Sequence, residues 1–293
     1  METKVAKLGS SLLVPCVQEL AKSNMDAIPQ RYIRSDQDQL IIHNEVPSHL
    51  EVPVIDMKRL LSHESMDSEL AKLHCACKDW GFFQLVNYEV KHSLLEKIKK
   101  EVQDLFDLPM EEKKKLWQYP GEVEGFGQAF VVSEDQKLDW GDLFFMRDPR
   151  YLFIRSENLA MAILAQMAKA LEIEAREIIE IFEDGHQSMR MNYTLHVLNL
   201  TKSLGLLHIQ MPQIISNGTY RSIEHRATVN SEKERLSIAT FYAPRYSAEI
   251  GPAPSLISKQ TPALFKKIGV EEYFQTLFAR ELHSKSHLDT LRI

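Results

Sequence analysis

Three residues in the C-terminal half have side chains suited to holding a small charged ligand: His225, Arg235 and Ser237. An imidazole can ligate a metal ion, and a guanidinium can form a two-pronged, charge-assisted pair with a carboxylate. Alternate residues of a strand point to the same face, so Arg235 and Ser237 can reach one ligand if this segment is a strand. In isolation, such a short pattern more often marks a strand histidine and a surface cation. Its meaning depends on the elements around it.

The spacing of apolar residues predicts the elements that must position these side chains. Strands are expected at 52–56, 189–193, 220–229 and 236–243, and a turn into a buried strand is expected at 80–87. An alternating stretch begins at 125–127, and Asn217-Gly218 after Ile214-Ile215 is typical of a hairpin turn, because both residues tolerate positive φ. An amphipathic stretch covers 17–25, and the expected helices are 68–79, 90–108, 110–116, 157–182, 262–267 and 271–280.

Three blocks of sequence together resemble the plant 2-oxoglutarate-dependent dioxygenases. PVID at 53–56, followed by WGFFQLVN at 80–87, resembles their N-terminal half. MRMNY at 189–193 resembles the strand that opens their catalytic jelly roll, and NGTYRSIEHR at 217–226 with RLS at 235–237 resembles its end. The likeness covers residues 14–293 and is strongest to the senescence-related-gene type and the codeine and thebaine O-demethylase group. It implies an α+β fold, with a helical N-terminal region packed on a double-stranded β-helix (jelly roll).

The resemblance also implies a chemistry. Enzymes of this family bind Fe(II) through two histidines and one carboxylate, and they use 2-oxoglutarate as co-substrate. They couple its decarboxylation to hydroxylation or O-demethylation of a small plant metabolite. By resemblance, His225 is the distal metal ligand, Arg235 grips the far carboxylate of 2-oxoglutarate, and Ser237 donates a second hydrogen bond to it. Alkaloid, flavonoid and hormone-like substrates all stay open, because a fold does not choose a substrate.

The sequence departs from the family between Thr194 and Ser216. The family requires His-x-Asp in this interval, which here contains no Asp or Glu; its only histidines are His196 and His208, and Gln210 stands two residues after His208. The second tyrosine that helps to seat 2-oxoglutarate in relatives is replaced by Thr194. The interval is also shorter than the roughly 30 to 40 residues that four strands with their turns require. We therefore expect an incomplete jelly roll and no turnover by this chain.

The unusual stretch has an explanation in its codons. Residues 194–212 read TLHVLNLTKSLGLLHIQMP. Codons can be chosen for them that, read one nucleotide out of frame, give PPCPQPDQVIGLTPHSDA, which is what relatives have at this place, with His-Ser-Asp included. We hypothesise an out-of-frame reading of the metal motif, with the frame restored just before Ile214. A second gap is expected between 151–152 and Asn158, and Tyr88-Glu89 replaces the usual His-Gly of a turn.

Other residues offer weaker alternatives. Asp184 with His186, or His196 with His208, could serve as substitute metal ligands, but neither spacing matches a known facial triad. An aromatic group could line a substrate pocket, although such clusters more often form plain core. Its members are Phe126, Phe130, Trp140, Phe144 and Phe145.

Composition narrows the class of protein. The chain has 293 residues and a net charge of −6, which argues against nucleic acid as the main partner. Its cysteines, Cys16, Cys75 and Cys77, predict neither a disulfide framework nor a zinc site, and we expect the last two to be buried thiols. Lys113–Lys115 is interpreted as a solvated helix face. With no signal peptide or membrane span recognised, we expect a cytoplasmic monomer that acts on a small molecule, without nucleic-acid or membrane partners.

The expected organisation has five regions. They are a leader at 1–50, an N-terminal dioxygenase region at 51–155, connecting helices at 156–187, a truncated jelly roll at 188–250 and C-terminal helices at 251–293. Two functional hypotheses follow. The chain is either a faulty reading of an active dioxygenase, or a truncated protein that acts at most as a binding module. An unrelated globular protein is a remote third.

Overall fold

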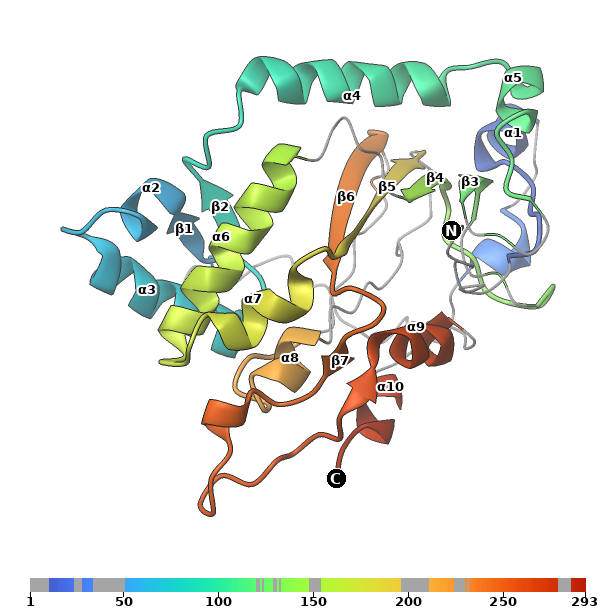
Figure 1. Ribbon diagram of the computed structural model, residues 1–293. Helices are drawn as coiled ribbons and strands as arrows, with labels where there is room; N and C mark the ends of the chain where they lie inside the picture. The colour runs from blue at the N-terminus through green and yellow to red at the C-terminus, as the bar shows by residue number, and fades with distance from the viewer. Residues whose placement is uncertain are drawn as a thin grey trace.

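The computed structural model describes residues 11–23, 28–33, 51–119, 122, 124–128, 131, 133–147, 154–195, 211–223, 230, 232–278 and 286–293. Its centre is a four-stranded antiparallel sheet in the order β3-β4-β5-β6, with neighbouring strands side by side in Figure 1. The strands are β3 (Gly125–Gly127), β4 (Asp142–Arg147), β5 (His186–Thr194) and β6 (Arg235–Ala243). The strands expected at 189–193 and 236–243 are thus confirmed.

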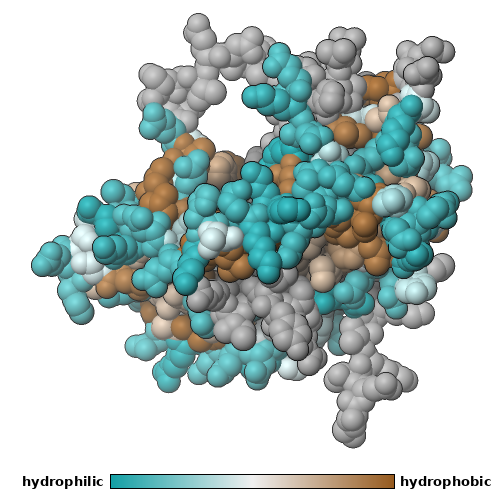
Figure 2. Space-filling model, turned by 90° about the horizontal axis from the view of Figure 1, so that it is seen from above, coloured by the Kyte–Doolittle hydropathy of each residue, from teal (hydrophilic) through white to brown (hydrophobic). Residues whose placement is uncertain are grey.

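Helix α4 (His92–Phe106) covers one face of this sheet, along the top of Figure 1. Its apolar side, which includes Val102 and Phe106, packs on Phe126, Met191 and Tyr193 in one buried cluster. Its other side is polar and carries ion pairs one helical turn apart, such as that between Lys100 Nζ and Asp104 Oδ2 at 2.6 Å. Figure 2 shows hydrophilic side chains over much of this outward surface. The amphipathic spacing therefore predicted both the helix and the face that it buries.

A smaller unit precedes α4. Strands β1 (Val54–Asp56) and β2 (Gln84–Val86) pair in parallel, and α2 (Met57–Leu60) and α3 (Met66–Cys75) connect them with a π-helical turn at Ala76–Trp80. Helix α6 (Ile154–Ala170) packs against α3. Strand β2 is largely exposed, so the expectation of a buried strand there is wrong.

Shorter elements complete the described fold: α1 (Val17–Lys22), α5 (Met110–Lys114), α7 (Arg176–Phe182), α8 (Met211–Ile215), α9 (Val270–Phe278), α10 (Ser286–Thr290), the 3-10 turns Gln30–Tyr32 and Pro254–Leu256, and the paired strands β7 (Glu249–Ile250) and β8 (Ile268–Gly269). The helix expected at 157–182 is two helices, α6 and α7. None of the helices in the described ranges is long and apolar enough to cross a membrane.

The hairpin turn predicted at Asn217-Gly218 is wrong, and the strand predicted at 220–229 is not seen in its described part. Asn217 and Gly218 do have positive φ, 50° and 85°, but they end helix α8 instead of turning a hairpin. The N–H of Gly218 donates to the carbonyl of Gln213 at 2.8 Å, which satisfies the helix terminus. The described part of the strand expected at 220–229, residues 220–223, is irregular.

The helix expected at 262–267 is extended chain. Its backbone pairs with the C-terminal segment instead: the N–H of Lys266 donates to the carbonyl of Leu291 at 2.8 Å.

Burial corrects two further expectations. Cys77 is buried as expected, but Cys75 is exposed. Lys113 is not solvated: it is buried, its Nζ donates to Gln18 Oε1 at 2.7 Å, and it lies 5.7 Å from the centre of the Phe126 ring. Phe126 and Trp140 are buried, so the core interpretation of the aromatic group is confirmed for these two, while Phe130 lies outside the described residues.

Candidate cofactor-binding face

Strands β5 and β6 bring the predicted ligand-binding residues onto one surface. Their antiparallel register places Thr194 opposite Arg235, Asn192 opposite Ser237, and Arg190 opposite Ala239. Directly paired residues lie on the same side of a sheet, and side chains alternate along each strand. These residues therefore point away from α4. We call Arg190, Asn192, Thr194, Arg235 and Ser237 together the polar face.

Hydrogen bonds link the middle of the polar face. The Nε–H of Arg190 donates to Asn192 Oδ1 at 2.6 Å, and Asn192 Nδ2 donates to Ser237 Oγ at 3.4 Å, which is a long contact. Burial lowers the pKa of the Arg190 guanidinium, although attraction to Asp139 opposes this. A guanidinium still keeps its proton at neutral pH. Arg190 is therefore a partly desolvated cation whose hydrogen bond is to a neutral amide.

Thr194 adds an unsatisfied hydroxyl to the same face. Its side chain is buried, with 2% of its surface exposed, and its Oγ1 lacks a hydrogen-bond partner within the described part of the chain. Gly141 lies beside it: a Cβ there would come within 3.4 Å of Thr194 Oγ1 and 2.8 Å of the Tyr193 carbonyl oxygen. A glycine at this position therefore leaves room beside the hydroxyl. A buried hydroxyl without a partner is costly and is a common mark of a site that a ligand completes.

The opposite face of β5 has a structural role. Tyr193 stacks on Phe106 of α4 with ring centroids 5.4 Å apart, and its hydroxyl donates to the Glu234 carboxylate. Burial, followed by this hydrogen bond, raises the pKa of Tyr193 to about 12. The phenol therefore stays protonated and anchors α4 and the start of β6 to β5.

The residues that the structure describes do not form a ligand set for the iron of the family. Within the described ranges, no cluster of three His, Cys, Asp or Glu side chains could hold a metal ion. His225 lies outside the described residues, as do His196 and His208. His186, from the alternative pair with Asp184, packs against Tyr246 in a tilted arrangement with ring centroids 3.9 Å apart. Because the interval from Thr194 to Ser216 has no carboxylate, the sequence also lacks an acidic ligand at the place where the family has one.

The residues do fit a carboxylate. Arg235 and Ser237 lie on one face, as their spacing predicted, and the Thr194 hydroxyl lies in the cross-strand pair with Arg235. The sequence interpretation missed Arg190, Asn192 and Thr194 as part of this surface. Their period of two within 189–194 was a usable signal, because it places all three on the side of Arg235 once the strands pair.

Comparison with known proteins identifies the family. The N-terminal model of non-haem dioxygenases in morphine synthesis matches residues 52–159, and the model of the 2OG-Fe(II) oxygenase superfamily matches residues 178–244. Protein SRG1 of Arabidopsis thaliana is 46% identical over 359 aligned positions, with both chains covered completely. Codeine O-demethylase of Papaver somniferum is 39% identical over 361 positions, again across both chains. Both alignments are longer than the 293 residues of this chain, so they contain positions at which it has no residue.

A solved structure agrees. The crystal structure of JOX2 in complex with 2OG, Fe and JA is 25% identical in sequence and superimposes with a TM-score of 0.76. The superposition covers 96% of this chain and 98% of that structure. Such neighbours have the jelly-roll fold, so the α+β jelly-roll class is confirmed. Fe(II) and 2-oxoglutarate are the cofactors of this family. The chain belongs to the plant 2-oxoglutarate/iron(II)-dependent oxygenases, as a relative of SRG1 and the codeine and thebaine O-demethylases.

Proposed function

We propose that the lineage of this chain oxidises a small plant metabolite, by hydroxylation or O-demethylation coupled to decarboxylation of 2-oxoglutarate. The support comes from its relatives. Besides codeine O-demethylase, they include a flavonoid 7-O-demethylase of Ocimum basilicum at 39% identity and thebaine 6-O-demethylase of Papaver somniferum at 38%. Removal of an O-methyl group from a polycyclic or phenolic molecule recurs among them. The substrate of this lineage is accordingly proposed to be a methoxylated small molecule.

This chain, by contrast, is proposed to perform no turnover. The observation that carries the proposal is the absence of any carboxylate between Thr194 and Ser216. An oxygenase iron site of this class needs an anionic ligand beside its two histidines, and a lone imidazole such as His225 holds iron weakly. What this chain retains is the carboxylate grip proposed for Arg235 and Ser237. Its proposed function is therefore that of a binding module without catalysis.

Isothermal titration of the full chain with manganese(II), an inert substitute for iron(II), tests this proposal. Titrations are run without oxygen, in the presence and in the absence of 2-oxoglutarate. We expect no saturable heat from manganese(II) at micromolar protein in either case. Metal binding that is saturable and tightened by 2-oxoglutarate would show that other residues complete the site, and the proposed loss of function would be wrong.

A second candidate function rests on the codon observation. If residues 194–212 are an out-of-frame reading, the gene encodes an active oxygenase of the same lineage with His-Ser-Asp in place. In that case the absence of turnover belongs to this polypeptide and not to the gene. The nucleotide sequence of the transcript tests this candidate.

A further inference from the structure

The two arginines of the polar face stand at the ends of one row of cross-strand pairs. Arg190, opposite Ala239, is at one end, and Arg235, opposite Thr194, is at the other; Asn192 and Ser237 form the pair between them. Four residues along a strand correspond to roughly 13 Å between Cα atoms. Because both side chains are long and lie on the same face, their guanidinium groups can converge on one ligand between them.

Neither arginine forms a close ion pair within the described residues, although the Asp139 carboxylate attracts Arg190 from a longer distance. Within the described residues, no carboxylate lies within ion-pair distance of Arg190 or Arg235; for comparison, Arg147 on β4 has Glu124 Oε2 at 3.5 Å. Arg190 uses its Nε–H on Asn192, which leaves its two terminal nitrogens for another acceptor. A desolvated cation is unfavourable unless an anion or several acceptors compensate it. Arg190 is thus only partly compensated, and the exposed Arg235 is open to a ligand from solvent, so both cations can bind an anion.

The groups between the arginines suit the same ligand. Asn192 turns its carbonyl oxygen toward Arg190 and its amide nitrogen toward Ser237, so Ser237 Oγ can accept from the amide and donate its own proton onward. The buried Thr194 hydroxyl offers one more donor beside Arg235, and Gly141 leaves room next to it. The polar face thus presents a cation and a hydroxyl group at one end and a second cation at the other.

We propose that the polar face binds a dicarboxylate without any metal ion, with one carboxylate on Arg235 and Ser237 and the second on Arg190. The assignment of the first carboxylate rests on the grip proposed above; the role of Arg190 and the independence from metal are additional. Arg190 substitutes electrostatically for the metal charge that this chain does not supply. The ligand class is a short dicarboxylate of the size of 2-oxoglutarate.

The test is isothermal titration of the full chain in EDTA with three probes. 2-Oxoglutarate and glutarate each have two carboxylates, whereas 2-oxobutyrate keeps the keto acid but has only one. We expect the two dicarboxylates to bind saturably and 2-oxobutyrate to bind roughly tenfold more weakly or worse, because it loses one charge-assisted pair. Arg190→Met and Arg235→Met should each weaken dicarboxylate binding to the level of 2-oxobutyrate. Arg292→Met, an exposed arginine paired with Asp289, is the matched control and should leave binding unchanged.

Charge-preserving variants separate binding from folding. Arg190→Lys and Arg235→Lys keep a cation at each end but lose the two-pronged geometry of a guanidinium, so they should bind dicarboxylates more tightly than the Met variants and more weakly than the original chain. Circular dichroism confirms the fold of every variant. The absence of saturable binding in EDTA would overturn the proposal, as would an Arg190→Met variant that is folded and binds like the original. Equal affinity for 2-oxobutyrate would also overturn it, because the ligand would then be a monocarboxylate.

A parallel titration with manganese(II) in place of EDTA distinguishes the two proposals. Dicarboxylate binding in EDTA that manganese(II) does not change supports both. Binding in EDTA that manganese(II) tightens supports the metal-independent site and contradicts the proposed loss of metal binding. Binding that occurs only with manganese(II) contradicts both.

Discussion

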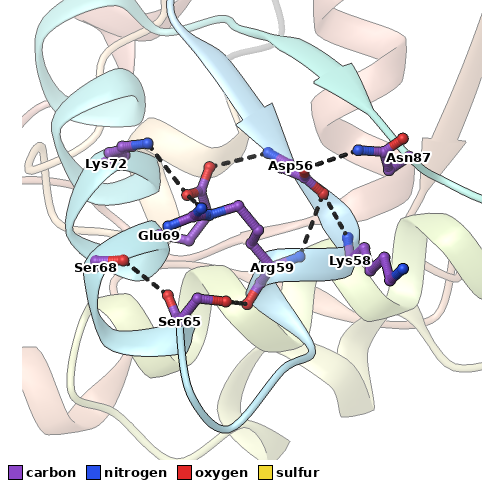
Figure 3. A network of polar contacts seen from close by, with 8 residues as sticks. All are labelled: Asp56, Lys58, Arg59, Ser65, Ser68, Glu69, Lys72 and Asn87. Atoms are coloured by element: carbon purple, nitrogen blue, oxygen red, sulfur yellow. Dashed lines mark hydrogen bonds and ion pairs between the residues drawn. The ribbon is translucent and has the colours of Figure 1, made fainter.

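At the scale of single residues, Glu69 shows how one buried carboxylate organises the N-terminal unit. Its side chain is 1% exposed, and it accepts from the backbone N–H of Asp56 at 3.0 Å, from Arg59 Nε at 3.1 Å and from Lys72 Nζ at 3.2 Å. Figure 3 shows these contacts meeting between α3 and the end of β1. Asp56 in turn caps α2 and receives Asn87 Nδ2 at 2.8 Å. A buried charge is tolerated here because several donors compensate it.

Glu69→Gln should therefore destabilise the fold, by about 1–2 kcal/mol at neutral pH, because the ion pairs with Arg59 and Lys72 are lost while one acceptor for Asp56 remains. Burial raises the pKa of Glu69, but the hydrogen bonds from Asp56 and Lys72 outweigh it, and the net pKa is lowered from 4.5. Because the pKa of Glu69 is lowered in the folded chain, the stabilisation that its charge contributes is fully present above the ordinary carboxyl pKa. It is lost as pH falls through the lowered pKa of the folded chain. Urea unfolding at pH 7 and at pH 3 measures both effects.

The exposed Glu64→Gln is the control for this prediction, since Glu64 lies on the surface of the same unit. It should change the free energy of unfolding by less than about 0.5 kcal/mol at either pH. The difference between Glu69→Gln and the original chain should shrink as pH falls toward 3, because Glu69 is then protonated in the unfolded chain and increasingly protonated in the folded one. A difference that stays constant with pH would mean that the charge of Glu69 contributes nothing.

The sequence could predict some of these residue-level features and not others. Arg235 and Ser237 share a face because the period of a strand is a local property, and local periodicity is visible in the sequence. The contacts of Glu69 and the burial of Lys113 depend on elements that are distant in sequence, such as Gln18 beside Lys113. No local pattern specifies them, because charged residues at such positions look the same whether the opposing element is present or absent.

At the scale of elements, Gly81 joins the N-terminal unit to the segment after α8. It ends the π-helical turn with φ of 71°, and a Cβ there would lie 2.4 Å from the carbonyl oxygen of Arg221. Nearby, the N–H of Arg221 donates to the carbonyl of Cys77 at 3.1 Å, and Tyr220 is buried in the same core cluster as Leu73. The two segments can approach this closely only because position 81 has no side chain.

Gly81→Ala should consequently lower the free energy of unfolding by about 2–4 kcal/mol, through strain at positive φ together with a backbone clash. The matched control is Gly269→Ala, whose added methyl would meet nothing within 4 Å. That variant should stay within about 1 kcal/mol of the original, as measured by thermal unfolding. Equal effects of the two substitutions would contradict the close approach at Gly81.

A second joint between elements is the docking of α1 on the sheet. Asp142 at the start of β4 is buried and accepts from the N–H groups of Val17 and Gln18, at 2.8 and 3.0 Å, and from the thiol of Cys16 at 3.1 Å. It satisfies backbone donors at the first turn of a helix more than a hundred residues away in sequence. Burial raises the pKa of Asp142 above 3.8, with these hydrogen bonds opposing the rise.

Asp142→Ala should release residues 11–23 from the sheet, because it leaves those buried donors without an acceptor. Limited proteolysis should cleave this segment roughly tenfold faster or more, while β4 to β6 stay protected in hydrogen exchange. Asp142→Asn keeps one acceptor oxygen, so its cleavage rate should fall between those of Asp142→Ala and the original chain.

The pKa of Asp142 is raised in the folded chain. The stabilisation that its carboxyl group contributes is therefore complete below the ordinary carboxyl pKa and declines as pH rises through the raised pKa of the folded chain. Cleavage of the original chain should therefore increase from pH 4 to pH 7.

The elements also show why the hairpin prediction near Asn217 is wrong. A type I′ hairpin and the C-terminus of a helix both require positive φ, so Asn-Gly is compatible with either. The choice was made by packing, since Ile214 and Ile215 are buried in a cluster with Ile250 and Val270. Periodicity over five residues cannot separate a short helix from a strand. The long amphipathic helix α4 could be predicted because its period repeats over four turns.

At the scale of the whole molecule, the described residues combine the N-terminal unit of β1, β2, α2 and α3 with a four-stranded antiparallel sheet. The described four-stranded sheet contains β5 and β6, which resemble the opening and the end of the family jelly roll, directly paired in register over nine residues. Alignment with SRG1 extends over 359 positions, against 293 residues here. The alignment therefore contains positions at which this chain has no residue.

Loss of a single thymine between the codons of Tyr193 and Thr194 would explain the start of this difference. The reading TAT-TAC-CCT-CCA becomes TAT-ACC-CTC-CA when one thymine is removed, which turns Tyr-Tyr-Pro-Pro into Tyr-Thr-Leu-His, as at 193–196. The same loss accounts for the threonine that stands where relatives have a second tyrosine. One event thus removes that tyrosine and the His-Ser-Asp motif together.

Sequencing the transcript across codons 192–216 decides the matter. We expect one additional nucleotide after codon 193, an open frame reading PPCPQP, and further coding sequence between His-Ser-Asp and Ile214. Leu195 provides the sharpest check, because only a CTC codon there yields two prolines in the shifted frame. The protein made from such a transcript should bind manganese(II) saturably in the presence of 2-oxoglutarate, whereas the 293-residue chain should not. Any other Leu195 codon would instead make the carboxylate-free interval a property of the gene, and metal-free ligand binding its remaining capacity.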